Sequence, residues 1–152
     1  MKKIITLSMS LLLLMSIAVM AGKPNGPAAY NGLNKGNSDV MHLELYEKDI
    51  NWDAVVGGAW GKMVYSEDSF VFNGHGLVAG TDYTLINYDE AWSSGQVCLA
   101  AGTSNNGGNI NLAGDTVGTG KIWLVLSSDV NCDAGAMIAW NPSEYLFEYN
   151  TI

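Results

Sequence analysis

The chain contains no arginine, and only seven lysines stand against its 15 acidic residues, which gives a formal net charge of −8. Tight phosphate binding depends on clustered Lys and Arg, and the bidentate arginine fork that reads guanine is missing altogether. We therefore expect no nucleic-acid partner and no binding to anionic lipid surfaces. The acidity suits a protein that stays soluble outside the cell or attracts cations.

Histidine is also scarce, since only His42 and His75 are present, and the common catalytic motifs are missing. There is no Gly-x-Ser-x-Gly, no His-Glu-x-x-His and no cluster of histidines. We therefore expect a protein that is not an enzyme, with His75 as a turn residue. The alternative is a small extracellular hydrolase, which would use His75 as its proton carrier or a pair of carboxylates that cleave a glycosidic bond.

The longest apolar run lies at the N-terminus. Lys2 and Lys3 precede 17 residues from Ile4 to Met20, and the run closes on Ala21 and Gly22. This pattern predicts a signal peptide over residues 1–21, cleaved after Ala21, and a protein that is secreted or held at the cell surface. A spanning helix needs about 20 apolar residues, and this run of 17 is slightly short of that length, so cleavage is favoured. The alternative is an uncleaved anchor, which would be the protein's only contact with the membrane.

The remaining 131 residues have the size of one domain and a net charge near −10. Residues 22–39 are Gly, Pro, Asn, Ala and Ser with few large apolar side chains, which predicts a flexible leader. We expect residues 40–152 to form a single domain.

Apolar and polar residues alternate in short runs along this domain. Met41, Leu43 and Leu45 set the pattern, and similar runs follow at 60–65, 70–73, 83–88, 96–101, 109–112, 121–127 and 145–149. Turns rich in Gly and Asn separate them, and no amphipathic helix is evident. The pattern predicts an all-β fold, an antiparallel β-sandwich of about eight short strands, with a small β-barrel as the alternative. The run 122–126 is apolar on both faces and predicts a central strand.

Cys98 and Cys132 are the only cysteines. An even number of cysteines in an exported chain favours a disulfide, which should stabilise the fold by on the order of 3 to 4 kcal/mol. The competing interpretation, a cysteine nucleophile with a histidine base, has no recognisable nucleophile motif to support it.

Several longer motifs point to a known set of proteins. The motifs are GGAWGKM (57–63), FNGHGL (72–77), YTLI (83–86), KIWLVLS (121–127) and WNPSEYLFE (140–148). Through them the chain, over about residues 41–152, resembles a family of uncharacterised exported β-domains found chiefly in archaea, methanogens among them. The resemblance implies export, a cysteine pair and a β fold, and it implies no activity.

Asp129, Asn131 and Asp133 stand at alternate positions and could direct three oxygen ligands at one hard cation such as calcium. The loop does not follow the helix-loop-helix calcium template, because Ala134 and Trp140 occupy the positions of its Gly and Glu. Asp89, Glu90 or Asp115 would have to complete the site. If these residues bind calcium, the protein would be a calcium-stabilised structural protein of the cell envelope. Apart from this calcium ion, we expect no cofactor.

Five tryptophans are many for so small a domain. Trp60 and Trp123 lie within predicted strands and are expected in the core, whereas Trp52, Trp92 and Trp140 lie near loops. Exposed aromatic rings stack on sugars and anchor protein interfaces. The sequence therefore favours a non-catalytic binding module that uses Trp52, Trp92 and Trp140 to bind a cell-surface glycan or protein.

Overall fold

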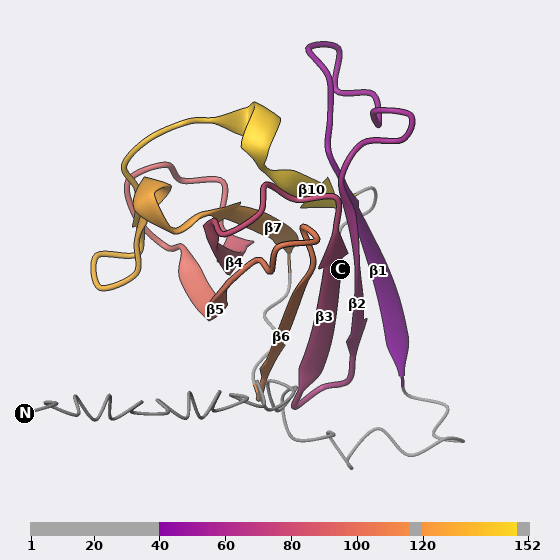
Figure 1. Cartoon of the computed structure of the whole chain (residues 1–152). Coiled ribbons are helices and arrows are strands. Elements are labelled where there is room, and N and C mark those ends of the chain that lie inside the picture. Colours follow the sequence, from indigo (N-terminus) through magenta and orange to yellow (C-terminus); the bar gives the residue numbers. More distant parts are fainter. Residues whose placement is uncertain (1–39, 116–119, 149–152) are drawn as a thin grey trace, which may run out of the picture.

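A computed structural model describes residues 40–115 and 120–148 (Figure 1). The predicted signal peptide (1–21) and leader (22–39) lie outside the described residues, so both stay predictions. In the part of the chain that is described, no helix has the length and apolar character needed to cross a membrane.

Eight antiparallel strands form one hydrogen-bonded sheet, which confirms the all-β prediction. They are β1 (Met41–Tyr46), β2 (Trp60–Tyr65), β3 (Phe70–His75), β4 (Asp82–Tyr88), β5 (Val97–Thr103), β6 (Ile110–Gly114), β7 (Lys121–Leu126) and β10 (Leu146–Glu148). Their order in the sheet is β5-β4-β7-β10-β1-β2-β3-β6. All eight strands overlap the runs expected from the alternation of apolar residues.

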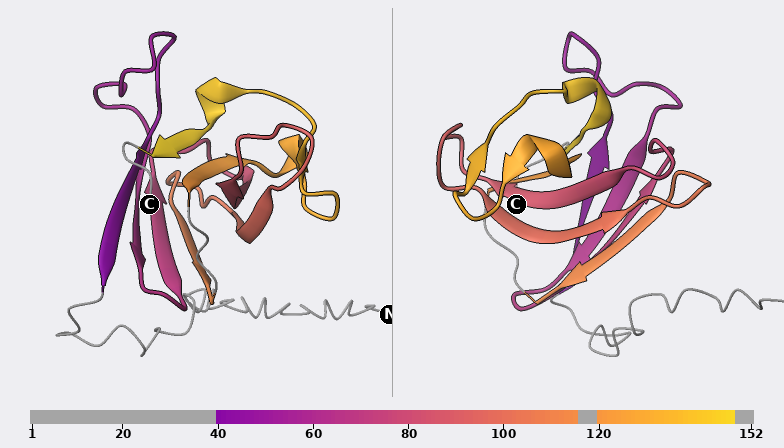
Figure 2. Two further views of the ribbon diagram at one scale, coloured as in Figure 1. Left: turned by 180° about the vertical axis from the view of Figure 1, so that it is seen from behind. Right: turned by 60° about the vertical axis from the view of Figure 1, so that its left-hand side comes forward.

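The sheet curls until its two edge strands, β5 and β6, approach each other, as the turned views in Figure 2 show. No ladder joins β5 to β6 within the described residues, so one seam stays unsealed. The fold is therefore closer to the barrel alternative than to the expected sandwich of two sheets. The reason is β10, which pairs with β7 on one side and β1 on the other and makes the two halves continuous.

A second, small sheet pairs β8 (Val130–Asn131) with β9 (Ala136–Met137). Two short 3-10 turns, η1 (Ser127–Asp129) and η2 (Pro142–Glu144), flank this region. The sequence pattern did not predict β8 and β9, because two-residue strands are too short to show alternation.

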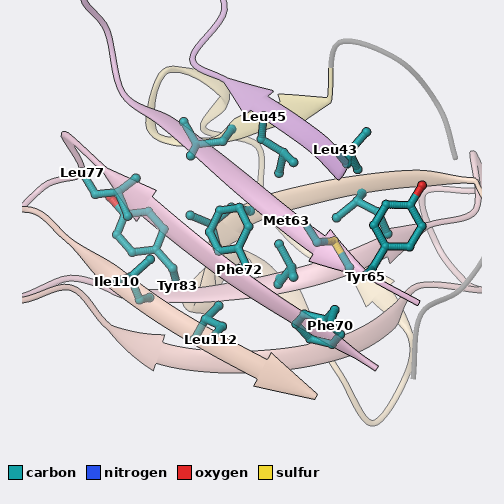
Figure 3. Packing of buried hydrophobic residues seen from close by; sticks show 14 residues of the cluster. Leu43, Leu45, Met63, Tyr65, Phe70, Phe72, Leu77, Tyr83, Ile110 and Leu112 are labelled. Atoms are coloured by element: carbon teal, nitrogen blue, oxygen red, sulfur yellow. The ribbon is translucent and has the colours of Figure 1, made fainter. Parts of the chain in front are cut away.

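Two apolar clusters lie on opposite sides of β7. The larger holds Ile122 and Leu124 with residues of the curled sheet such as Phe72 and Leu45 (Figure 3). The smaller holds Trp123 and Val125 with Ile86, Val130, Met137, Tyr145 and Phe147. Because neighbouring side chains of β7 alternate between the clusters, the prediction of a central strand covered on both faces is confirmed. The smaller cluster borders the candidate site.

Candidate ligand-binding site

The smaller apolar cluster borders a surface hollow of about 600 Å³, here called the aromatic pocket. Six aromatic side chains line it: Trp52, Tyr88, Trp92, Trp123, Trp140 and Phe147. The three tryptophans predicted for ligand binding thus come together in one place, although they belong to three separate loops. Figure 1 shows one of these loops, between β1 and β2, standing above the end of the sheet.

Trp140 lies at the centre of the aromatic group. Its ring centroid is 5.6 Å from that of Trp92, 6.0 Å from that of Trp123 and 6.4 Å from that of Trp52. The exposed fractions are 41% for Trp140, 42% for Trp92 and 54% for Trp52. Each ring is therefore supported by neighbours and still reachable from solvent.

A tight turn positions Trp52. The Asp49 side chain accepts hydrogen bonds from the backbone N–H groups of Asn51 (2.8 Å) and Asp53 (3.0 Å), and the Trp52 N–H donates to the Asp49 carbonyl (3.0 Å). Within this turn Trp52 has φ of 66°, a conformation that costs energy for a bulky residue. A strained residue held by its surroundings is a frequent feature of binding sites.

A buried glutamine positions Trp92. The Gln96 side chain accepts a hydrogen bond from the Asp89 N–H (3.2 Å) and donates to the Ser94 and Ala91 carbonyls, so it fills the loop from inside. The Trp92 carbonyl accepts the Met137 N–H of β9 at 3.0 Å. The loop that carries Trp92 is thus attached to the small β8–β9 sheet.

Asp129 holds the segment that carries Trp140. Its buried carboxylate accepts hydrogen bonds from Asn141 Nδ2 (2.7 Å), from Ser128 Oγ (2.9 Å) and from the Tyr145 hydroxyl. Burial raises the pKa of Asp129, but these three donors outweigh burial and leave the pKa below its ordinary value. Burial and the carboxylate of Asp129 together raise the pKa of Tyr145, whose proton therefore stays in this hydrogen bond.

Tyr145→Phe is expected to lower the free energy of unfolding by about 1 to 3 kcal/mol, because a buried carboxylate oxygen loses a donor. Tyr65→Phe provides a matched control, since Tyr65 is also buried in the sheet but lies outside the Asp129 network. Urea denaturation at pH 7 measures both variants. Equal stability of Tyr145→Phe and the wild type would show that the network does not anchor the fold.

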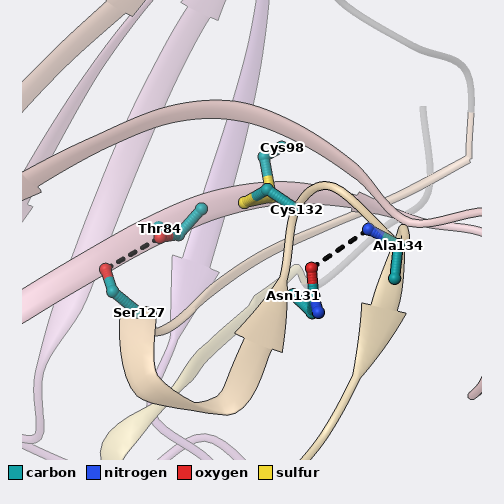
Figure 4. Close-up of a disulfide and its surroundings, with 6 residues drawn as sticks. All are labelled: Thr84, Cys98, Ser127, Asn131, Cys132 and Ala134. Carbon is teal, nitrogen blue, oxygen red and sulfur yellow. Dashed lines mark hydrogen bonds between the residues drawn. A yellow bond between two sulfur atoms is a disulfide. The ribbon is translucent and has the colours of Figure 1, made fainter.

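The residues of the calcium hypothesis face different environments. Asp129 is buried, whereas Asn131 and Asp133 are exposed. The side-chain oxygen of Asn131 accepts the Ala134 N–H at 3.0 Å (Figure 4). The described residues contain no group of three or more His, Cys, Asp or Glu that could hold a metal ion. The calcium site stays a prediction.

The predicted disulfide between Cys98 and Cys132 is confirmed, with 5.6 Å between the two Cα atoms. It joins β5 to the loop that follows β8, and Figure 4 shows it near the hydrogen bond between Thr84 and Ser127 (2.8 Å). The bridge therefore fixes the small sheet, and with it the Trp92 loop, to an edge strand of the large one.

Four charged side chains complete the aromatic pocket. Glu90 and Lys121 form an ion pair at 2.7 Å, which lowers the pKa of Glu90 and raises that of Lys121. Lys48 and Glu148 also line the hollow. Two positive and two negative groups therefore share one aromatic site.

Glu148 is the most unusual of these groups. Its Oε2 atom is buried and has no hydrogen-bond partner among the described residues. Burial raises the pKa of Glu148 to about 7, although its own backbone N–H, Lys121, Lys48 and the Trp123 indole all act to lower it. A buried polar atom without a partner is rare in folded proteins and calls for an explanation.

Trp60 corrects one sequence prediction. It was expected in the core with Trp123, and Trp123 is indeed buried and stacks on Tyr88 with centroids 3.8 Å apart. Trp60, however, is 43% exposed, because it begins β2 at the end of the sheet. Its ring lies 4.6 Å from that of His75, whose Nδ1 is 2.7 Å from the Asn109 side-chain oxygen. His75 was expected in a turn, but it is the last residue of β3, because the strand continues through Asn73 and Gly74; it does not line the aromatic pocket.

No family model, curated protein or solved structure matches this chain.

Proposed function

We propose that the protein is an exported, non-catalytic binding module that holds an extracellular ligand in the aromatic pocket. The convergence of Trp52, Trp92 and Trp140 on one hollow is the observation that carries this proposal. Large apolar side chains left half exposed around one concavity are typical of binding surfaces, because burying them against a ligand is favourable. Exposed aromatic rings of this kind bind cell-surface glycans or proteins, which are the ligands expected from the sequence, and they also bind small organic molecules.

Export is part of this proposal. The N-terminal pattern of residues 1–21 supports it, and so does the disulfide, because disulfides persist in oxidising compartments outside the cytoplasm. Membership of the archaeal family that the motifs resemble would agree with this location.

Trp140→Ala is expected to weaken ligand binding at least tenfold, because Trp140 contacts the other rings of the pocket and anchor tryptophans carry a large share of binding energy. Trp60→Ala is the matched control, since Trp60 is similarly exposed and lies outside the pocket. Tryptophan fluorescence titrations against a panel of glycans, organic cations and envelope proteins measure both variants.

Equal weakening by the two substitutions, or binding that survives Trp140→Ala, would contradict the assignment of the pocket as the binding site. Trp140→Ala also needs a folding control, and the near-UV circular dichroism of the unliganded variant supplies it.

A glycoside hydrolase is the second candidate, favoured by one observation. Glu90 and Glu148 line the same pocket, and their surroundings lower the pKa of one and raise the pKa of the other. Such a pair can divide the roles of base and acid. Release of reducing sugar by the wild type, lost in Glu148→Gln, would establish this function and overturn the non-catalytic one.

A further inference from the structure

Three pairs of aromatic rings in the pocket are steeply inclined to one another, although Tyr88 stacks on Trp123 at 14° and the angle between Trp52 and Trp140 is 36°. The interplanar angle is 70° between Trp92 and Trp140, 70° between Trp52 and Phe147, and 76° between Trp123 and Phe147. A sugar ring stacks best on a flat aromatic face, whereas a compact cation gains from several rings that surround it. The arrangement therefore resembles an enclosure more than a stacking platform.

The pocket also holds a carboxylate that the described residues satisfy only in part: the Trp123 indole donates a hydrogen bond to Glu148, but the Oε2 atom of Glu148 has no partner. Within residues 40–115 and 120–148 this buried oxygen finds no hydrogen-bond donor, even though Lys48 and Lys121 line the same hollow. Lys121 is engaged at 2.7 Å by Glu90. A buried carboxylate oxygen left in this state is costly, and a bound cation would remove much of that cost.

We propose that the aromatic pocket binds a small organic cation, an alkylated ammonium group, which lies against the tryptophan rings with Glu148 as its counter-charge. This inference rests on the proposed function, and it names the class of ligand for that same site. The ring faces attract the cation through their quadrupoles, and the carboxylate supplies the full negative charge. An uncharged ligand of the same shape lacks both attractions.

Binding of this ligand should depend on pH. Only the ionised form of Glu148 is an effective counter-charge, and its pKa of about 7 makes that form a minority below neutrality. The charged or titratable groups that line the pocket with it are Lys48, Lys121, Glu90 and Tyr88. Between pH 5.5 and pH 8 Lys121 stays protonated, since its pKa is raised, and Glu90 stays ionised, since its pKa is lowered. Glu148 therefore dominates the change.

The test compares choline with 3,3-dimethylbutan-1-ol, its neutral carbon isostere, by isothermal titration calorimetry on the oxidised protein. We expect choline to bind at pH 8 at least tenfold more tightly than the isostere. We expect its affinity to fall about tenfold or more at pH 5.5, and to fall by at least tenfold in Glu148→Gln at pH 8. Glu67→Gln, which changes an exposed acid in the turn between β2 and β3, outside the pocket, serves as the control and should retain the affinity.

Equal affinity for the two isosteres, or no loss in Glu148→Gln, would overturn the cation proposal. If a neutral glycan binds instead and Trp140→Ala abolishes that binding, the proposed function stands and the cation class is wrong. If neither choline nor any other ligand perturbs the pocket tryptophans, both proposals fail.

Discussion

Replacement of Cys98 and Cys132 by serine is expected to lower the free energy of unfolding by about 3 to 4 kcal/mol. The bridge spans 34 residues and restricts the unfolded chain accordingly. Because a domain of this size is typically stable by only about 5 to 15 kcal/mol, the loss would be a large share of the total. Denaturant unfolding of the oxidised wild type and the double variant measures the difference.

The bridge also acts on the pocket. Cys132 lies three residues before Gly135, whose carbonyl accepts the Gln96 N–H at 2.9 Å, and Gln96 shapes the loop that carries Trp92. We therefore expect the double variant to lose order around Trp92 as well as stability. Reductant should weaken the wild type and leave the double variant unchanged. Equal stability of the oxidised and reduced wild type would show that the bridge is dispensable.

Glu148→Gln is expected to stabilise the protein at pH 8, by about 2 to 3 kcal/mol, and to change its stability little at pH 4.5. Burial raises the folded-state pKa of Glu148 from an ordinary value of 4.5 to about 7. The folded protein therefore holds this proton more tightly than the unfolded chain does. The resulting stability is fully present below pH 4.5 and is lost as the pH rises through 7. Glutamine keeps the neutral character of the protonated acid at every pH.

Urea denaturation of the wild type and Glu148→Gln at pH 4.5, 6 and 8 measures this effect. Glu90→Gln removes only an exposed ion pair with Lys121 and should not reproduce the gain. A Glu148→Gln variant that is less stable than the wild type at pH 8 would mean that the carboxylate has a partner that stabilises its charge. The predicted combination, a more stable fold with weaker cation binding, would mark Glu148 as a residue kept for function.

Alternation of apolar residues was enough to locate the eight strands of the large sheet, but not β8 and β9. Leu43 and Leu45 of β1 are buried as their spacing requires, and β7, apolar on both faces, lies between β4 and β10 with a cluster on each side. The order of the strands in the sheet could not be predicted in this way. Periodicity describes neighbouring residues along the chain, whereas strand pairing joins residues that are far apart in the sequence. The three residues of β10 decide between two sheets and one, and their sequence does not show which neighbours they pair with.

The candidate site could be predicted only in part. Trp52, Trp92 and Trp140 could be proposed because each tryptophan lies near a predicted turn, but nothing in the sequence places three separate loops around one hollow. Glu148 could not be found, since a glutamate at a polar position near the end of a strand is ordinary. What makes it unusual is its burial beside Trp123, which depends on the pairing of β10 with β7.

Two residues of the pocket have features that are unfavourable for stability. Trp52 has a positive φ, and Glu148 carries a buried oxygen without a partner in the described part of the chain. Elsewhere in the sheet the buried side chains are almost all apolar. Departures of this kind tend to gather at functional sites, because selection for stability alone would remove them.

The indole N–H signals of the five tryptophans, followed by ¹H–¹⁵N NMR during a titration with choline at pH 8, test the central claim most directly. Trp52, Trp92, Trp123 and Trp140 line the aromatic pocket, and Trp60 lies apart from it against His75. We predict that the four pocket signals shift together with one saturating affinity while the Trp60 signal stays in place. Pocket signals that do not move, or a Trp60 signal that moves as much as they do, would contradict the assignment.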